Sequence, residues 1–205
     1  MKTGLFTKCT TYNFEKLFKD KGYAWFTKGS YNLNIIGVRS NNNKVTDKYD
    51  DILVVDYNTD NGHKRVCYTI TTEPGKYYMQ NLCNPKGAAI LVPGQYRGCW
   101  QIGLRHGKYK ALCQRKAVKV YRDNNKDMIY NMTPKSIDKG IFGINIHRSN
   151  KTCICDTIDK YSAGCQVFND PVEFNAFMRL CETQRKLYGN TFTYTLINEE
   201  DMQYV

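Results

Sequence analysis

Two strand-like runs joined by a tight turn constrain the fold of this chain more than any other feature of its sequence. Residues 51–57 and 63–71 are rich in β-branched and aromatic residues, and the segment between them, Asn58 to Gly62 (NTDNG), is a strong hairpin signal. Further apolar runs at 31–38, 88–92, 99–103, 117–121 and 191–197 are separated by turns rich in Pro, Gly or Asn. This pattern predicts a chain built mainly of β-structure.

A short amphipathic helix is expected near the N-terminal end. Phe14, Leu17 and Phe18 are spaced i, i+3 and i+4 after Asn13, and Gly22 is placed to end the helix. Because its apolar face covers only about two turns, we expect it to pack on the sheet and not to anchor the chain in a membrane.

A second helix is expected after residue 170. Asp170 and Pro171 form a cap followed by a proline at the first helical position, and Gly189 marks the end of the helix. Phe174, Phe177, Met178 and Cys181 then share one face, so Cys181 is expected to be a buried packing residue.

The size and composition fit one domain. With 205 residues, of which 41% are hydrophobic, the chain is long enough for a single core and short for two. We expect one mainly β domain of the β-rich α+β class over residues 1–205, with flanking N- and C-terminal helices. Residues 1–50 are expected to form a helix and strand extension and residues 51–198 the core.

The charge and the cysteine content indicate which partners the protein binds and in which compartment it is synthesised. Thirty Lys and Arg against nineteen Asp and Glu give a formal charge of +11, which favours acidic cell-wall polymers as partners. The charges are dispersed and no nucleic-acid-binding motif is present, so we do not expect nucleic acid as a partner. The nine cysteines form no disulfide framework, and neither a signal peptide nor a membrane span is evident. We therefore expect cytoplasmic synthesis with reduced thiols.

The chemistry is expected in one segment, Gly143 to Val167. An apolar run ends at His147, and a small-residue turn then presents Cys165. An imidazole within hydrogen-bond reach can activate a thiol, and a neighbouring imidazolium would make Cys165 the most reactive of the nine cysteines. The N–H groups of Gly164 and Cys165 are expected to stabilise an oxyanion, and Ser162 to orient the turn. A side chain at Gly164 is expected to abolish turnover and leave the fold largely intact.

Residues 144–147 (INIH) and 162–165 (SAGC) resemble the signature of the L,D-transpeptidase catalytic domain, the YkuD-like family, in which a strand-terminal His precedes a [Ser/Thr]-His-Gly-Cys turn. Residues 72–77 (TEPGKY) are similar to the family's Thr-Pro-x-Gly-x-Tyr/Phe segment, and the two motifs occur in the family's order.

The resemblance implies a fold, a substrate and a reaction. The fold would be a β-sandwich or barrel, and the substrate the stem peptides of peptidoglycan. Cys165 would form a thioester that water hydrolyses or an amine transpeptidates, with no cofactor and no metal. We expect the substrate to contact residues that flank the INIH and SAGC stretches, namely Arg148, Ser149, Tyr161 and Gln166. His106, in a basic loop, is expected to contact it as well. His106 is also a second candidate base.

Departures from the family pattern leave alternatives open. Ala163 stands where the family has His, and Gln166 and Val167 stand where it has an aliphatic residue and Arg. The sequence of the motif is similar to a bacteriophage-type variant of the family. This resemblance indicates a wall-degrading or remodelling protein that acts at the bacterial wall or periplasm or as a virion component. The alternative is a catalytically degenerate wall-binding or host-interaction module.

The sequence allows other roles for His147 and Cys165, and it contains one further motif-like segment. His147 and Cys165 can be ordinary core residues, or they can bind zinc with Cys153 and Cys155, although the spacing lacks a usual zinc knuckle. Residues 123–127 (DNNKD) are similar to the start of a calcium loop. Met128 at the position of the required Gly and Pro134 at that of the closing Glu favour a simple turn.

Overall fold

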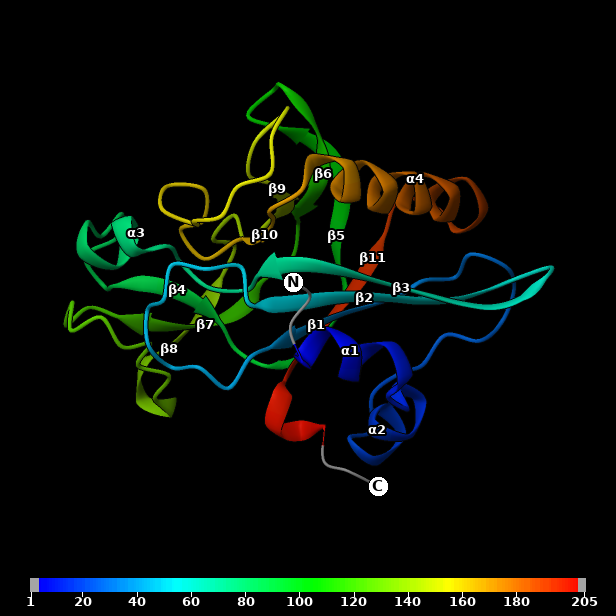
Figure 1. Ribbon diagram of the computed structural model, residues 1–205, viewed down its shortest axis with the longest axis horizontal. Helices are drawn as coiled ribbons and strands as arrows, with labels where there is room; N and C mark the ends of the chain where they lie inside the picture. The colour runs from blue at the N-terminus through cyan, green and yellow to red at the C-terminus, as the bar shows by residue number, and fades with distance from the viewer. Residues whose placement is uncertain (1–3, 203–205) are drawn as a thin grey trace.

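An eight-stranded closed barrel forms the centre of the molecule (Figure 1). The structure is a computed structural model and describes residues 4–202. The strands of the barrel are β1 (Asn34–Arg39), β2 (Asp51–Thr59), β3 (Gly62–Thr71), β5 (Gly94–Arg105), β6 (Tyr109–Gln114), β9 (Ile146–Arg148), β10 (Gln166–Phe168) and β11 (Phe192–Asn198). They pair in the order β1, β11, β5, β6, β9, β10, β3, β2. The predicted mainly β fold with flanking helices is confirmed, and so is the hairpin, which β2 and β3 form.

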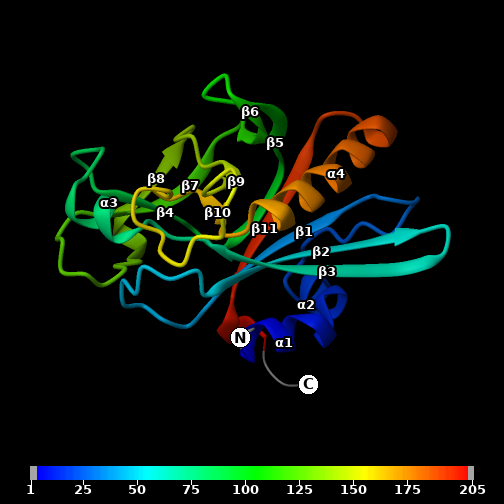
Figure 2. The ribbon, with the colours of Figure 1, turned by 45° about the horizontal axis from the view of Figure 1, so that its top comes forward.

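A small second sheet lies beside the barrel. It contains β4 (Ala88–Leu91), β7 (Val118–Asp123) and β8 (Ile137–Gly140) in the order β4, β7, β8. The short helices α3 (Lys76–Gln80) and η1 (Pro134–Ser136) complete this part of the molecule. Figure 2 shows this sheet on the side of the barrel where β9 and β10 run.

The N-terminal helices α1 (Gly4–Thr11) and α2 (Phe14–Asp20) cover the outer face of β1 and β2. Side chains alternate along a strand, so Ile35 and Leu53 enter the barrel core while Ile36 and Val54 pack against the helices. This double burial explains why β1 is apolar on both faces. It also shows that the predicted extension over residues 1–50 supplies a strand of the barrel itself, between β2 and β11.

The long helix α4 (Pro171–Tyr188) packs on the barrel and leads into β11 and the short helix η2 (Glu199–Asp201). Its start follows the sequence signal, because the Asp170 carboxylate accepts a hydrogen bond from the Val172 N–H at 2.7 Å. Cys181 is fully buried in the core, which confirms its predicted packing role. Within residues 4–202, no helix has both the length and the apolar character needed to cross a membrane.

Candidate functional site

The pairing of β9 with β10 sets the positions of His147 and Cys165. The two strands are parallel, with Val167 opposite His147 and Gln166 opposite Ile146. Ile146 faces the barrel core, so His147 and Val167 face outward, and Cys165, two residues before Val167, faces outward as well. The predicted base and nucleophile therefore lie on the same face of the sheet, although no hydrogen bond joins their side chains among residues 4–202.

This outer face is covered and not open to solvent. The connection between β9 and β10, residues 149–165, folds back over it, and Cys165 packs with Tyr49, Ile158 and the half-buried Tyr161. His147 is 1% exposed and Cys165 is 9% exposed. A substrate therefore reaches the thiol only if part of the covering connection moves.

His147 is held in the tautomer that a general base requires. Its Nδ1 atom lies 2.8 Å from the Arg148 carbonyl oxygen, so Nδ1 carries the hydrogen and Nε2 carries the lone pair. This buried Nε2 atom has no hydrogen-bond partner within residues 4–202. Burial, assisted by the nearby Arg105 guanidinium, lowers the pKa of His147 to about 3. The expectation of an imidazolium beside the thiol is therefore wrong for the resting site, because the ring is neutral.

Cys165 is also neutral at rest. Its thiol donates a hydrogen bond to the Gly143 carbonyl oxygen at 3.3 Å and accepts one from the Asn145 N–H at 3.5 Å. Burial raises the pKa of Cys165, while the Asn145 N–H and Arg105 oppose this rise. Since only the thiolate is a strong nucleophile, the proton must leave during attack and not before it. The most accessible thiols in the described chain are instead the exposed Cys83 and Cys153.

Arg105 is a site residue that the sequence did not reveal. It ends β5, pairs with Tyr109 across the hairpin, and places its guanidinium beside Cys165. Its Nε atom is buried and has no hydrogen-bond partner among residues 4–202. His106, the residue considered in its place, lies exposed at the tip of the hairpin with a φ of 50°. The only signal for Arg105 in the sequence was its position next to His106.

The turn before Cys165 is ordered by Ser162, as predicted. The Ser162 hydroxyl donates to the Cys165 carbonyl oxygen at 2.9 Å and accepts from the Gly164 N–H at 3.1 Å. Because the Gly164 amide is engaged in this way, it is not free to bind an oxyanion as predicted. The Gly75 N–H donates to the Ser162 carbonyl oxygen at 2.9 Å, so the TEPGKY segment and the SAGC turn lie side by side.

A substitution at Gly164 tests the rigidity of this turn. Gly164 has a φ of 119°, and a Cβ atom there would collide with the Ala89 carbonyl oxygen of β4. We therefore expect Gly164→Ala to lower the free energy of unfolding by about 1–3 kcal/mol from backbone strain alone, and by more because of the collision. This corrects the expectation that a side chain at this position leaves the fold intact.

Urea denaturation measures this effect, with Gly107→Ala as the matched control. Gly107 also has a positive φ, of 68°, but nothing lies within 4 Å of its Cβ position. The difference between the two variants measures the collision with β4 together with the extra backbone strain at a φ of 119°. Equal stability of the two variants would show that β4 moves away without cost.

The predicted substrate-binding residues are spread over several environments. The Arg148 guanidinium lies 4.1 Å from the centre of the Tyr109 ring, and the Ser149 hydroxyl donates to the Asn169 carbonyl oxygen at 3.2 Å. Gln166 has no exposed surface and faces the barrel interior, where it accepts a hydrogen bond from the Tyr194 hydroxyl. The prediction that Gln166 contacts the substrate is therefore wrong. Tyr161 packs against the small apolar cluster that contains Cys165.

A cavity of about 330 Å³ opens beside the SAGC turn. It lies between the second sheet and the turn, and its lining includes Ala163, Phe142, Tyr78 and Arg122. Ala163 stands where the resembled family has His, so the smaller side chain widens this space. A larger cavity, of about 870 Å³, lies at α1, α2 and η2, and its lining contains none of the predicted site residues. We take the cavity at Ala163 as the candidate substrate site because it adjoins the cysteine turn, although neither Cys165 nor His147 lines it.

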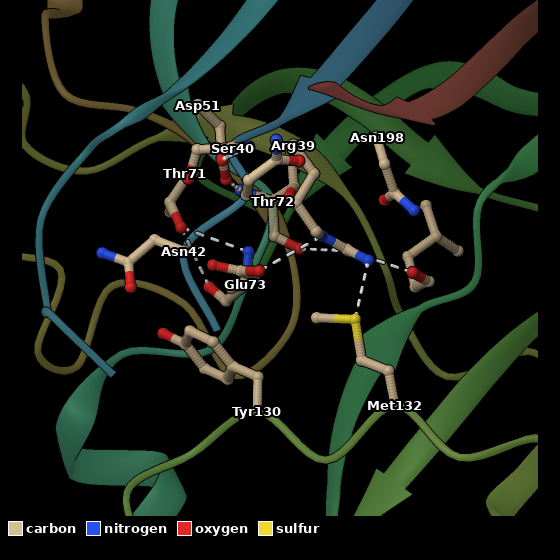
Figure 3. Close-up of polar contacts among 12 residues, drawn as sticks. Arg39, Ser40, Asn42, Asp51, Thr71, Thr72, Glu73, Tyr130, Met132 and Asn198 are labelled. Carbon is tan, nitrogen blue, oxygen red and sulfur yellow. Dashed lines mark hydrogen bonds and ion pairs between the residues drawn. The ribbon is translucent and has the colours of Figure 1, made fainter. Parts of the chain in front are cut away.

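A buried ionic cluster includes Thr72 and Glu73, the first two residues of the TEPGKY motif (Figure 3). The Arg39 Nε atom lies 3.2 Å from the Glu73 carboxylate and donates to the Thr72 hydroxyl at 3.0 Å. Asp51 accepts hydrogen bonds from the Ser40 and Thr72 N–H groups at 2.8 and 2.6 Å. Burial raises the pKa of both carboxyl groups, which Arg39 partly offsets. The cluster thus has its own cation and supports the segment that carries Gly75.

The zinc interpretation does not gain support from the geometry. In the described part of the chain, His147, Cys153, Cys155 and Cys165 do not supply three ligand atoms within 4.8 Å of one another. Cys153 is exposed, whereas His147 and Cys165 are buried.

Comparisons with known proteins give no family assignment. Neither the protein-family models, nor the curated proteins, nor the solved structures contain a match to this chain.

Proposed function

We propose that this protein catalyses cysteine-dependent acyl transfer on the stem peptides of peptidoglycan. One observation carries the proposal: the buried lone pair of His147 Nε2 has no partner and lies on the same strand face as the Cys165 thiol. An unsatisfied buried polar atom costs a folded protein about 1–3 kcal/mol. A base that takes a proton only during catalysis accounts for this cost.

The mechanism follows from the neutral pair. The Cys165 Sγ atom forms a bond to the substrate carbonyl carbon while its proton passes to His147 Nε2. The oxyanion that develops is stabilised by the Cys165 N–H and by the Arg105 guanidinium. The C–N bond then breaks, His147 returns its proton to the leaving amine, and a thioester remains on Cys165. Water or a second amine releases the acyl group.

The substrate class is supported by the resemblance and by charge. The two motifs resemble L,D-transpeptidase motifs, and the cavity at Ala163 adjoins the cysteine turn. The formal charge of +11 favours the acidic polymers of a bacterial wall. We infer a wall-degrading or remodelling role, as in the phage-type proteins whose motif sequence this chain resembles.

A second candidate function is supported by the burial of the site. Because Cys165 is 9% exposed and His147 is 1% exposed, the same fold can serve as a wall-binding module without turnover. In that case the protein would bind peptidoglycan but form no covalent intermediate.

To separate the two functions, the protein is incubated with purified peptidoglycan. Mass spectrometry then analyses the released peptide fragments and the protein itself. The enzyme is expected to release peptide fragments and to carry an acyl adduct on Cys165, and Cys165→Ala is expected to do neither. Cys99→Ala is the matched control, because Cys99 is another buried cysteine on a barrel strand. Binding without fragments or adduct would leave only the binding module.

A further inference from the structure

Oxygen atoms converge on one point in the loop that follows β7. The side-chain nitrogen of Asn131 lies 3.0–3.5 Å from five of them. They are Asp123 Oδ2, Asn125 Oδ1, both Asp127 carboxylate oxygens and the Ile129 carbonyl oxygen. An amide nitrogen carries only two hydrogens, so it cannot donate to all five, and four of the oxygens also accept from other N–H groups of the loop. The oxygens are arranged as they would be around a cation.

Asp123 supplies independent evidence that this loop binds a ligand. The residue is 2% exposed, and its Oδ1 atom is buried without a hydrogen-bond partner among residues 4–202. Its other oxygen, Oδ2, accepts from the Asn131 N–H at 2.8 Å, so the carboxylate points toward the loop. A buried carboxylate oxygen of this kind requires a proton, a water or a metal ion.

The spacing of the ligands is that of a calcium loop. Asp123, Asn125, Asp127, the Ile129 carbonyl and Asn131 fall at positions 1, 3, 5, 7 and 9, as in the loop of an EF-hand. Position 6 is Met128, and its φ of 65° is the left-handed conformation that a Gly normally provides there. The absence of Gly had favoured a simple turn, but the backbone adopts the required shape without it.

We propose that this loop binds a calcium ion. Asp123, Asn125, the Ile129 carbonyl and Asn131 supply one oxygen each, after the Asn131 amide turns its oxygen inward, and Asp127 supplies two. Six oxygens with a bidentate carboxylate suit Ca²⁺, whereas Mg²⁺ demands a stricter octahedron. Only two of the side-chain ligands are charged, and Pro134 replaces the closing Glu. We therefore expect a dissociation constant on the order of 10⁻⁴–10⁻³ M, the range of extracellular modules.

The calcium loop is connected to the rest of the molecule through Tyr130. Its N–H donates to the Asn43 carbonyl oxygen at 2.7 Å, and its hydroxyl donates to the Pro74 carbonyl oxygen at 2.8 Å. Ion binding would therefore stabilise the segment around Asn43 and the TEPGKY motif. The proposal does not depend on the chemistry of Cys165.

Thermal unfolding and calorimetric titration of the full chain test the proposal. Calcium chloride at about a hundred times the dissociation constant should raise the Tm by roughly 5–10 °C, and magnesium chloride should raise it by far less. Asp127→Asn should weaken calcium binding by at least about tenfold, because it removes charge and the bidentate contact. Asp156→Asn, a change at an exposed loop carboxylate, should bind calcium like the wild type.

A gain-of-affinity variant keeps the test valid if Asp127→Asn folds poorly. Asn125→Asp adds a charged ligand at position 3, so it should bind calcium at least about tenfold more tightly than the wild type. A Tm that does not respond to calcium would overturn the proposal. An equal response in the wild type, Asp127→Asn and Asn125→Asp would do the same, because binding would then lie elsewhere.

Discussion

Replacing His147 by Gln is expected to lower the rate of acyl transfer by about 10²–10⁴-fold and to leave peptidoglycan binding nearly unchanged. Gln fills much of the same buried space but cannot take the thiol proton. Because the pKa of Cys165 is raised by burial, the thiol has no other route to its reactive form. Binding persists because it rests on dispersed Lys and Arg side chains, and it should weaken with salt in both proteins alike.

The measurement is fragment release at matched amounts of bound protein. His106→Gln is the control, since His106 lies exposed at the β5–β6 tip and should retain full activity. Loss of release in His106→Gln together with normal release in His147→Gln would transfer the role of base to the hairpin tip. No release by any of the three proteins is the result that a pure binding module predicts.

Replacing Arg39 by Met is expected to destabilise the folded protein by about 3–5 kcal/mol at neutral pH. Arg39 is 2% exposed, and besides Glu73 it contacts the carbonyl oxygens of Thr72 and Leu91 at 3.3 and 3.0 Å. Its removal leaves the carboxylates of Asp51 and Glu73 buried without a cation. Urea denaturation measures the loss, and Arg97→Met, at an exposed arginine, should change stability by no more than about 0.5 kcal/mol.

The pH dependence of this loss has a definite sign. Burial raises the pKa of Asp51 and of Glu73 in the folded protein, so the folded state holds these protons more tightly than the unfolded chain. Their contribution to stability is complete below about pH 4 and is lost as the pH rises through the folded pKa values. Arg39→Met should therefore be least damaging in acid. The double variant Arg39→Met with Glu73→Gln should recover part of the loss at neutral pH, and an unchanged loss would contradict this explanation.

Local signals predicted much of the fold. The hairpin of β2 and β3, the cap at Asp170 and the apolar face of α4 depend on neighbouring residues, and each was visible in the sequence. α1, β6 and β8 were not predicted. β6 alternates weakly and contains Lys110 and Gln114, and its strand character depends on pairing with β5. The closure of the barrel depends on pairings between distant segments and left no local trace.

The residues of the candidate site stay a prediction from the motifs, and the sequence did not predict their burial. The order of His147, Ser162 and Cys165 follows from the motifs, whereas their burial depends on the connection over residues 149–165 and on the hairpin that carries Arg105. The calcium loop shows the reverse case. Its side-chain spacing was visible, but only the backbone geometry showed that Met128 takes the conformation expected of Gly.

The parallel pairing of β1 with β11 has a consequence for biosynthesis. Val38 pairs with Ile197, so the barrel cannot close until the last strand has left the ribosome. During that interval one edge of β1 lacks its partner, and the six cysteines that the finished fold buries are still reachable by oxidants. Long-range pairing of this kind also slows folding. The nascent chain should therefore require reducing conditions throughout translation, and production in an oxidising compartment should yield mispaired disulfides.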